Sequence, residues 1–143
     1  MATRPYIRSE QRQADLVEAV IRLCARSDPA ELTTAGIAKE LNLSQGALFR
    51  HFPNKQSLWE AVARWVQDKL ETEVLSVSEK YESPLAGLEA MFMAHVAFIA
   101  SHPGAPRLIL SELQKPEHSG AKIMIQQAVG HYRGHIQGLL KRG

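Results

Sequence analysis

The sequence contains a single cysteine, Cys24, among its 143 residues. An internal disulfide is therefore impossible, and the paired cysteines of a structural zinc site are missing. Long apolar runs are missing too. The longest, Met91 to Ala100, contains His95 and is far shorter than the roughly 20 residues of a membrane span, and the N-terminus has no apolar signal-peptide core. We therefore expect a cytoplasmic protein with no membrane partner.

An excess of charge is also nearly absent, because 17 Lys and Arg face 15 Asp and Glu. The small excess is not evenly spread. Residues 1–55 contain eight basic and six acidic side chains, and the remainder contains nine of each. The first third of the chain is therefore the part that favours contact with a polyanion.

Strand patterns are absent as well, since no window alternates polar and apolar residues with period two. Apolar residues recur instead at intervals of three and four, which predicts an all-α fold. N-caps are expected at Ser9, Thr33, Ser44, Asn54 and Ser83. The predicted helices cover about 10–26, 33–41, 45–51, 54–78, 84–101, 106–114 and the chain from 119 onward.

Two of the short predicted helices are joined by Asn42-Leu43-Ser44, which is the pattern of a helix-turn-helix. Asn42 tolerates a positive φ, and Leu43 is an apolar plug between the helices. The stretch resembles the DNA-binding domain of the TetR family of transcriptional repressors, and the specific resemblance covers about Arg12 to Val66. It rests on Ile37-Ala38, then Leu43-Ser44-x-Gly46-x-Leu48-Phe49-x-His51-Phe52, then Lys55.

The resemblance implies a three-helix DNA-binding domain over residues 1–56 and a helical effector-binding and dimerisation domain over 57–143. The helix over 45–51 would enter the major groove. There Gln45 can pair with adenine, Arg50 with guanine or a phosphate, and Ala47 with a thymine methyl. Gly46 would let the backbone approach DNA closely. The residues expected to face bases are Ser44, Gln45, Gly46, Ala47 and Arg50.

Phosphate contacts are expected on both sides of that helix. Thr33 and Thr34 open the preceding helix, where hydroxyl and backbone N–H groups bind phosphate. His51 and Lys55 would hold phosphates on the other side. Arg4 and Arg8 form a basic arm that would add contacts in the flanking groove.

Three positions depart from the family's pattern. Phe49, a further candidate DNA contact, replaces a common tyrosine and lacks the hydroxyl that would reach a phosphate; its alternative is a core position. Gly36 stands where an acidic residue would complete a capping box. Asn42-Leu43 replaces the usual Gly-Val but keeps the backbone option.

The second half of the chain is rich in methionine and large apolar residues. For each of them ordinary packing is the alternative to lining the apolar effector pocket that the resemblance implies. Small polar groups would orient the effector. The candidate pocket residues are Phe92, His95, Phe98, Met124, Gln127 and Tyr132.

Three glycines, Gly130, Gly134 and Gly138, fall on one stripe of the last predicted helix, and each costs about 1 kcal/mol relative to alanine. Either another helix packs very close to this stripe, or the helix is soft so that ligand binding can shift it. The family usually continues with two further helices that form its dimer interface. The chain is thus expected to be a piece of a longer regulator, or to dimerise through another surface such as this stripe.

Together these features predict a repressor that binds a palindromic operator as a homodimer and is released by a small, largely apolar effector. No enzymatic activity, cofactor or metal is expected. The alternative is a small helical ligand- or metal-binding protein that uses the histidine-rich second half, where His131 and His135 lie four apart. A structural adaptor without DNA binding is a third possibility.

Overall fold

The computed structural model describes residues 3–143, with side chains from residue 11 onward, and this range contains helices and no strand. The all-α prediction is confirmed. Three short turns connect the longer helices: η1 (Pro29–Glu31), the π-helical η2 (Leu70–Val74) and the 3-10 η3 (Leu75–Lys80). The α-helices are α1 (Thr3–Cys24), α2 (Thr34–Glu40), α3 (Gln45–His51), α4 (Lys55–Lys69), α5 (Pro84–Ser101), α6 (Gly104–Gln114) and α7 (Gly120–Arg142).

The helix starts follow the expected capping chemistry. The side chains of four expected caps each accept a hydrogen bond from the backbone N–H three residues on. Asn42 has φ 56°, the left-handed conformation that the sequence predicts for the turn. The confirmed caps are Thr33, Ser44, Asn54 and Ser83, and Ser119 caps α7 in the same way.

Three predicted boundaries are wrong. α1 begins at Thr3, so that Ser9 lies inside the helix and does not cap it. The α-helical part of the fourth helix ends at Lys69, and the hydroxyls of Thr72 and Ser76 bond to carbonyls four residues back, a contact that distorts helices. α6 begins at Gly104, before Pro106, because Pro103 already has helical backbone angles.

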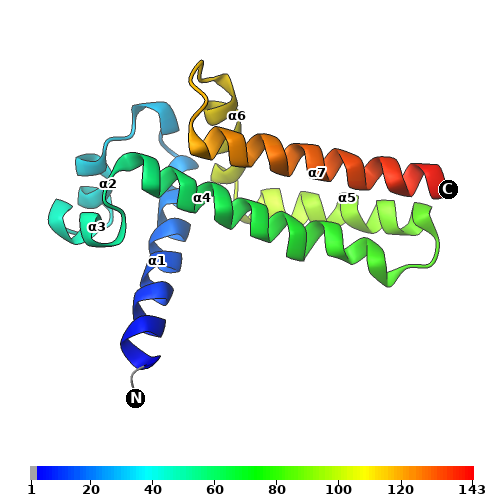
Figure 1. Cartoon of the computed structure of the whole chain (residues 1–143), viewed down its shortest axis with the longest axis horizontal. Coiled ribbons are helices and arrows are strands. Elements are labelled where there is room, and N and C mark those ends of the chain that lie inside the picture. The colour runs from blue at the N-terminus through cyan, green and yellow to red at the C-terminus, as the bar shows by residue number, and fades with distance from the viewer. Residues whose placement is uncertain (1–2) are drawn as a thin grey trace.

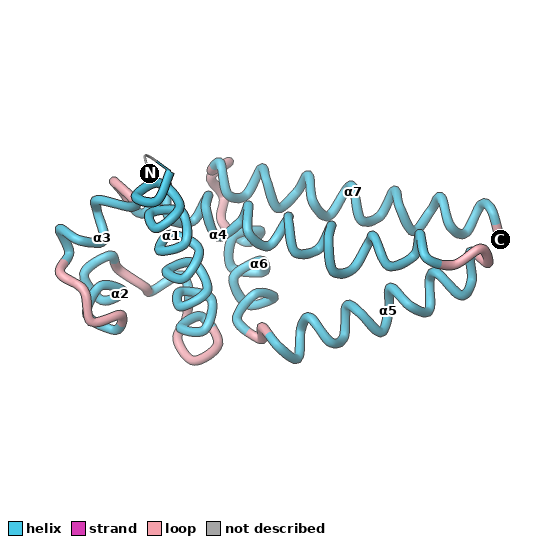
Figure 2. Tube along the Cα trace, turned by 90° about the horizontal axis from the view of Figure 1, so that it is seen from below, coloured by secondary structure: helices cyan, strands magenta, loops and turns pink. Residues whose placement is uncertain are grey.

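The helices form an elongated molecule with α2 and α3 at one end (Figure 1). α4, α5 and α7 extend together toward the other end, where the C-terminus lies, and α6 crosses between the two parts (Figure 2). One core runs from Val17 on α1 through α4 to Ile125 on α7. A smaller core of Leu75, Met91 and Leu139 closes the far end. The end formed by α2 and α3 is thus joined to the rest by a continuous apolar core.

α5 leaves most of its apolar surface exposed. The stripe that gave its helical pattern is largely in solvent, with Leu85 72% and Phe92 65% exposed. It buries a different stripe that includes Gly87, Met91 and Phe98. By length and composition α5 could cross a membrane, with mean hydropathy 1.4 over 18 residues, but single helices of globular proteins pass the same test.

α6 lies unusually close to α1. A Cβ atom on Gly104 would stand only 1.9 Å from the carbonyl oxygen of Ile21, so no larger residue fits there. Arg107 adds a hydrogen bond from Nη1 to the carbonyl oxygen of Ala25, at 2.8 Å, which satisfies a free carbonyl beyond the end of α1. Any displacement of α6 must therefore move the end of α1 as well.

The glycine stripe of α7 has a different environment from the expected one. Apart from the adjacent residues and the backbone of α7 itself, no atom lies within 4 Å of the place where a Cβ atom would stand on Gly130, Gly134 or Gly138. Close packing of another helix of this chain against the stripe is therefore wrong for the described residues. A softened helix and a contact with a second copy stay predictions.

Candidate DNA-binding site

α2 and α3 form a helix-turn-helix with a tight, hydrogen-bonded turn. The N–H of Leu43 donates to the carbonyl oxygen of Ala38 at 2.8 Å, and the N–H of Asn42 donates to that of Lys39 at 3.2 Å. The left-handed backbone of Asn42 makes this reversal possible. Leu43 is half-buried, as its predicted role between the helices requires.

α3 is held in place by its buried apolar side chains and by its N-terminal cap. Leu48 and Phe52 are buried, as predicted, and Ser44 Oγ accepts a hydrogen bond from the N–H of Ala47 at 3.0 Å. A helix of only seven residues is not stable by itself in water. Its packing on the core therefore sets its direction and decides which side chains face outward.

The outward face of α3 presents the predicted base-reading groups. Gln45, Gly46 and Arg50 are exposed, and Ala47 is half-buried. Phe49 is 37% exposed and therefore stands at the edge of this face. Gln45 Nε2 donates to Thr34 Oγ1 at 3.3 Å, so the two predicted DNA contacts on α2 and α3 touch each other. The surface around Gly46 is open, with no atom within 4 Å of an added Cβ atom.

The hydroxyls at the helix starts keep a proton to donate. Thr33 Oγ1 and Ser44 Oγ each use a lone pair to accept from a backbone N–H, at 3.0 Å. Their O–H groups can still donate to a phosphate oxygen.

At the C-terminal end of α3, the backbone carbonyl of His51 accepts a hydrogen bond from Gln13 Nε2 at 3.3 Å, which connects this end to α1.

Lys55 is the first residue of α4, directly after the helix-turn-helix. Burial lowers the pKa of its ammonium, the nearby charge of Lys115 lowers it further, and Glu112 acts in the opposite direction. Glu112 is buried and pairs with Lys115 at the end of α6. The predicted phosphate contact at Lys55 is thus half-buried against α6. The side chains of Arg4 and Arg8 lie outside the described residues.

A second feature is an apolar cavity of about 470 Å³ between α5, α6 and α7. Of the six predicted effector contacts, His95, Phe98 and Tyr132 line it. Phe92 points into solvent and Met124 packs on the main core. Gln127 lines a separate cavity of about 540 Å³ beside Gln67 and Glu71. The structure thus brings half of the predicted set together.

Sequence reasoning missed Arg133 as a residue of this cavity. The signal was present, because Arg133 is four residues after Val129 and three before Ile136, on the same side of the helix. It was overlooked because a charged residue does not belong to an apolar stripe. The apolar lining of the cavity also includes Ile99, Pro106 and Ile109.

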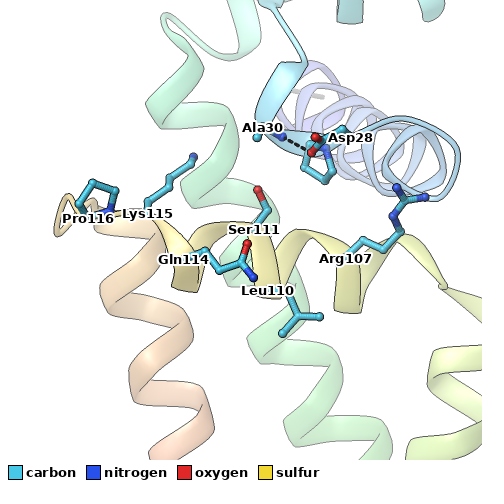
Figure 3. Close-up of a pocket in the computed structure, with 9 residues that line it drawn as sticks. Asp28, Ala30, Arg107, Leu110, Ser111, Gln114, Lys115 and Pro116 are labelled. Carbon is cyan, nitrogen blue, oxygen red and sulfur yellow. Dashed lines mark hydrogen bonds between the residues drawn. The ribbon is translucent and has the colours of Figure 1, made fainter.

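Another cavity, of about 500 Å³, lies on the outer side of α6 where η1 meets it. Figure 3 shows Arg107, Ser111 and Gln114 along α6, Lys115 directly after it and Asp28 opposite. Asp28 Oδ1 accepts a hydrogen bond from the N–H of Ala30 at 3.0 Å. Its lining is mixed and its polar groups do not converge on one point. We therefore do not assign a ligand to it.

The histidines of α7 make separate contacts. His131 Nε2 pairs with Glu71 Oε2 at 2.9 Å, and His135 Nε2 lies 2.8 Å from Ser78 Oγ. No group of three possible metal ligands occurs among the described residues. These two histidines connect α7 to η2 and η3.

The fold and the exposed face of α3 together define a helix-turn-helix DNA-binding protein. Residues 16–62 match the family of bacterial regulatory proteins named tetR. Over these residues the chain has the DNA-binding domain of the TetR family. The resemblance found in the sequence is thereby confirmed.

Relatives of the chain cover both parts of the molecule. The nucleoid occlusion factor SlmA of Marinomonas sp. is 22% identical over 134 residues, which cover 94% of this chain and 68% of that protein. SlmA of Idiomarina loihiensis is 24% identical over 130 residues, covering 91% and 66%. SlmA of Aliivibrio fischeri strain ES114 is 25% identical over 121 residues, covering 84% and 62%. The chain thus spans about two thirds of the length of these relatives.

Among solved structures, the chain shares its fold with apo AibR. The TM-score is 0.72, the sequence identity is 18%, and the match covers 91% of this chain and 70% of that one. At this identity the comparison shows the arrangement of the helices and nothing finer.

Proposed function

We propose that the chain is a ligand-responsive repressor that binds a palindromic operator as a homodimer. The observation that carries the proposal is the outward face of α3, where Gln45 and Arg50 are exposed on a helix whose apolar side is buried. Arg and Gln at these positions suit guanine and adenine edges in the major groove. The protein would work in the cytoplasm, at the nucleoid.

The roles of the two parts follow from the site. Residues 1–56 would read DNA, and residues 57–143 would bind the effector and the partner copy. Base contacts come from Gln45, Arg50 and Ala47, with Gly46 admitting the sugar-phosphate backbone. Thr33, Thr34, His51 and Lys55 would hold phosphates, Ser44 would begin the base-facing turn, and Phe49 would lie at the edge of the interface.

The test is binding to the palindrome nearest the protein's own promoter, measured by fluorescence anisotropy at several salt concentrations. Arg50→Ala should weaken binding about tenfold to a hundredfold and relax the sequence preference. Lys55→Ala should weaken binding to all sequences and reduce the salt slope by about one. Arg142→Ala, at the far end of α7, is the matched control. Unchanged affinity in both test variants would refute the docking.

A homodimer is expected because two recognition helices about 34 Å apart would read successive major grooves. The exposed apolar residues of α5 support self-association, since a monomer rarely leaves such a patch uncovered. Light scattering of the purified protein gives its mass in solution, alone and with operator. A single copy on each operator would contradict the dimer.

Effector release would work through α6. Pro106 and Ile109 line the apolar cavity, while Gly104 and Arg107 on the same helix contact α1. A ligand that binds better when α6 is displaced would lower DNA affinity by linkage. Ile109→Trp should fill the cavity and abolish the response to ligands, while DNA binding without ligand persists.

The names of the relatives suggest a second candidate, a nucleoid occlusion factor. It is favoured by the extent of the SlmA matches, which run over most of the chain and not only over the helix-turn-helix. Mapping of bound sites on the chromosome separates the two. Sites confined to a few promoters support the repressor, and many dispersed sites support the second candidate.

A further inference from the structure

The lining of the apolar cavity between α5, α6 and α7 includes a hydrogen-bonded pair of polar side chains and one arginine. All but three of its lining residues are apolar, and the three are His95, Tyr132 and Arg133. His95 Nδ1 lies 2.8 Å from the hydroxyl of Tyr132, and the two rings meet edge to face at 5.4 Å. His95 and Tyr132 therefore stand together, Arg133 follows Tyr132 in the sequence, and the remaining lining residues are apolar.

The His95–Tyr132 pair has a hydrogen-bond donor to spare in either tautomer of the neutral imidazole. If Tyr132 donates to Nδ1, the proton of His95 is on Nε2 and free. If Nδ1 donates to the hydroxyl oxygen, the Tyr132 O–H is free. Burial raises the pKa of Tyr132, which keeps the phenol protonated. The pair can therefore always donate one hydrogen bond to an acceptor.

Arg133 adds a positive charge, and the lining contains no acidic residue. Among the side chains that the structure describes, no carboxylate forms an ion pair with Arg133. Arg133 is exposed, and a guanidinium beside an apolar cavity pairs best with a planar anion, to which it donates two parallel hydrogen bonds. A ligand with a cationic group would be repelled from the same place.

We infer that this cavity binds an apolar carboxylic acid, with its hydrocarbon body against Phe98, Ile109 and Ile136 and its carboxylate held by Arg133 and the His95–Tyr132 pair. The inference rests on the proposed effector function and adds the chemical class of the effector. The cavity volume, about 470 Å³, is within the usual range for small-ligand sites.

The experiment compares three probes of equal chain length, octanoate, octanol and octylamine, below their micelle-forming concentrations. Calorimetry gives the affinity, and anisotropy of labelled operator gives the effect on DNA binding. Trp65 provides a second signal, because its ring lies 6.2 Å from that of Phe98 in the cavity wall. Octanoate should bind about tenfold tighter than octanol or more, octylamine should bind weakest, and octanoate should release the operator.

Variants assign the effect to the site. Arg133→Gln should reduce octanoate binding to the level of octanol and leave octanol binding unchanged. Tyr132→Phe should weaken octanoate binding several-fold. Arg142→Gln is the matched control on the same helix and should change nothing. Ile109→Trp should exclude all three probes, and circular dichroism confirms that each variant is folded.

The outcomes separate the two levels of the proposal. If octanol binds and releases DNA as well as octanoate does, or if octylamine binds best, the cavity is an effector site but not one for carboxylates. Octanoate binding that survives both Arg133→Gln and Ile109→Trp also overturns the inference, since it occurs elsewhere. If no probe binds and none affects DNA affinity, the inference fails; the effector function fails separately, if Ile109→Trp leaves the response to ligands unchanged.

Discussion

The helices α3 and α5 expose opposite kinds of side chain. α3 is short, buries its apolar residues and turns amide, guanidinium and glycine outward. α5 is long, carries only one acidic and no basic residue among its 18, and turns large apolar residues outward. The face of α3 is suited to a polyanion and that of α5 to a nonpolar surface. The two parts of the molecule therefore differ in which side chains their helices expose, although both are built of α-helices.

The largest expected difference is between two leucines, one on each helix. Leu48 on α3 is 1% exposed, so Leu48→Ala should lower the free energy of unfolding by about 2 to 5 kcal/mol. Leu85 on α5 is mostly in solvent, and Leu85→Ala should change it by less than about 0.5 kcal/mol. Urea denaturation of both variants measures the contrast. A large loss in Leu85→Ala would mean that α5 is covered in solution.

A titration compares a fully buried group with a half-buried one. Burial raises the pKa of the Cys24 thiol to about 11. Between about pH 9 and 11 the folded state therefore holds a proton that the unfolded state has lost, so the free energy of unfolding falls as pH rises through that window, by about 3 kcal/mol.

The matched variant for this titration is Cys24→Ala, in which that fall should be missing from the curve of stability against pH. Tyr132→Phe should change the curve less, since Tyr132 is only half-buried. Urea titrations at steps across the window give both curves. Parallel curves for the wild type and Cys24→Ala would contradict the burial of the thiol.

Removing a helix cap should lower the free energy of unfolding by less than removing a buried leucine side chain. Ser44→Ala removes the acceptor for the N–H of Ala47 and should cost about 1 kcal/mol. Because α3 is so short, operator affinity should fall as well. Ser119→Ala removes the corresponding cap of the 23-residue α7, with a similar cost in stability. DNA affinity that falls equally in both variants would show that global stability, and not the shape of α3, is measured.

The smallest effects concern two exposed glycines. Gly134→Ala should stabilise α7 by about 1 kcal/mol, since a methyl group meets no atom there. Gly46→Ala should stabilise α3 by less, about 0.5 kcal/mol, yet weaken operator binding, because the methyl group separates the backbone from DNA. Thermal melting and anisotropy read the two effects. Unchanged DNA affinity in Gly46→Ala would remove the close-approach role.

The helix-turn-helix could be predicted from the sequence, and the buried face of α5 could not. In the helix-turn-helix, the bounds of α3, the caps Thr33 and Ser44 and the turn at Asn42 were all predicted, because each depends on residues within a few positions. In α5 the helix was predicted and its buried face was not. Apolar residues stand on every side of that helix, so their spacing does not distinguish the stripe of Met91 from that of Phe92.

The candidate sites differ for the same reason. The exposed face of α3 could be read from the motif, although its contacts with DNA stay predictions. The apolar cavity joins residues of three helices that lie up to about 40 positions apart, and of the six residues proposed from the family resemblance only His95, Phe98 and Tyr132 line it. Arg133 shares one side of α7 with Val129 and Ile136, which its spacing indicates, but that this side faces α5 and α6 is a property of the tertiary structure.

The sequence by itself thus determined the helices, their caps, the class of DNA-binding motif and the excess of positive charge in the first third, because these are local properties of neighbouring residues. Tertiary structure alone decided that Gly104 must be glycine against Ile21, that the stripe of Gly130 and Gly134 is open, and that Arg133 shares a cavity with His95. Those facts depend on distances between helices, which are set by how whole side-chain surfaces pack together.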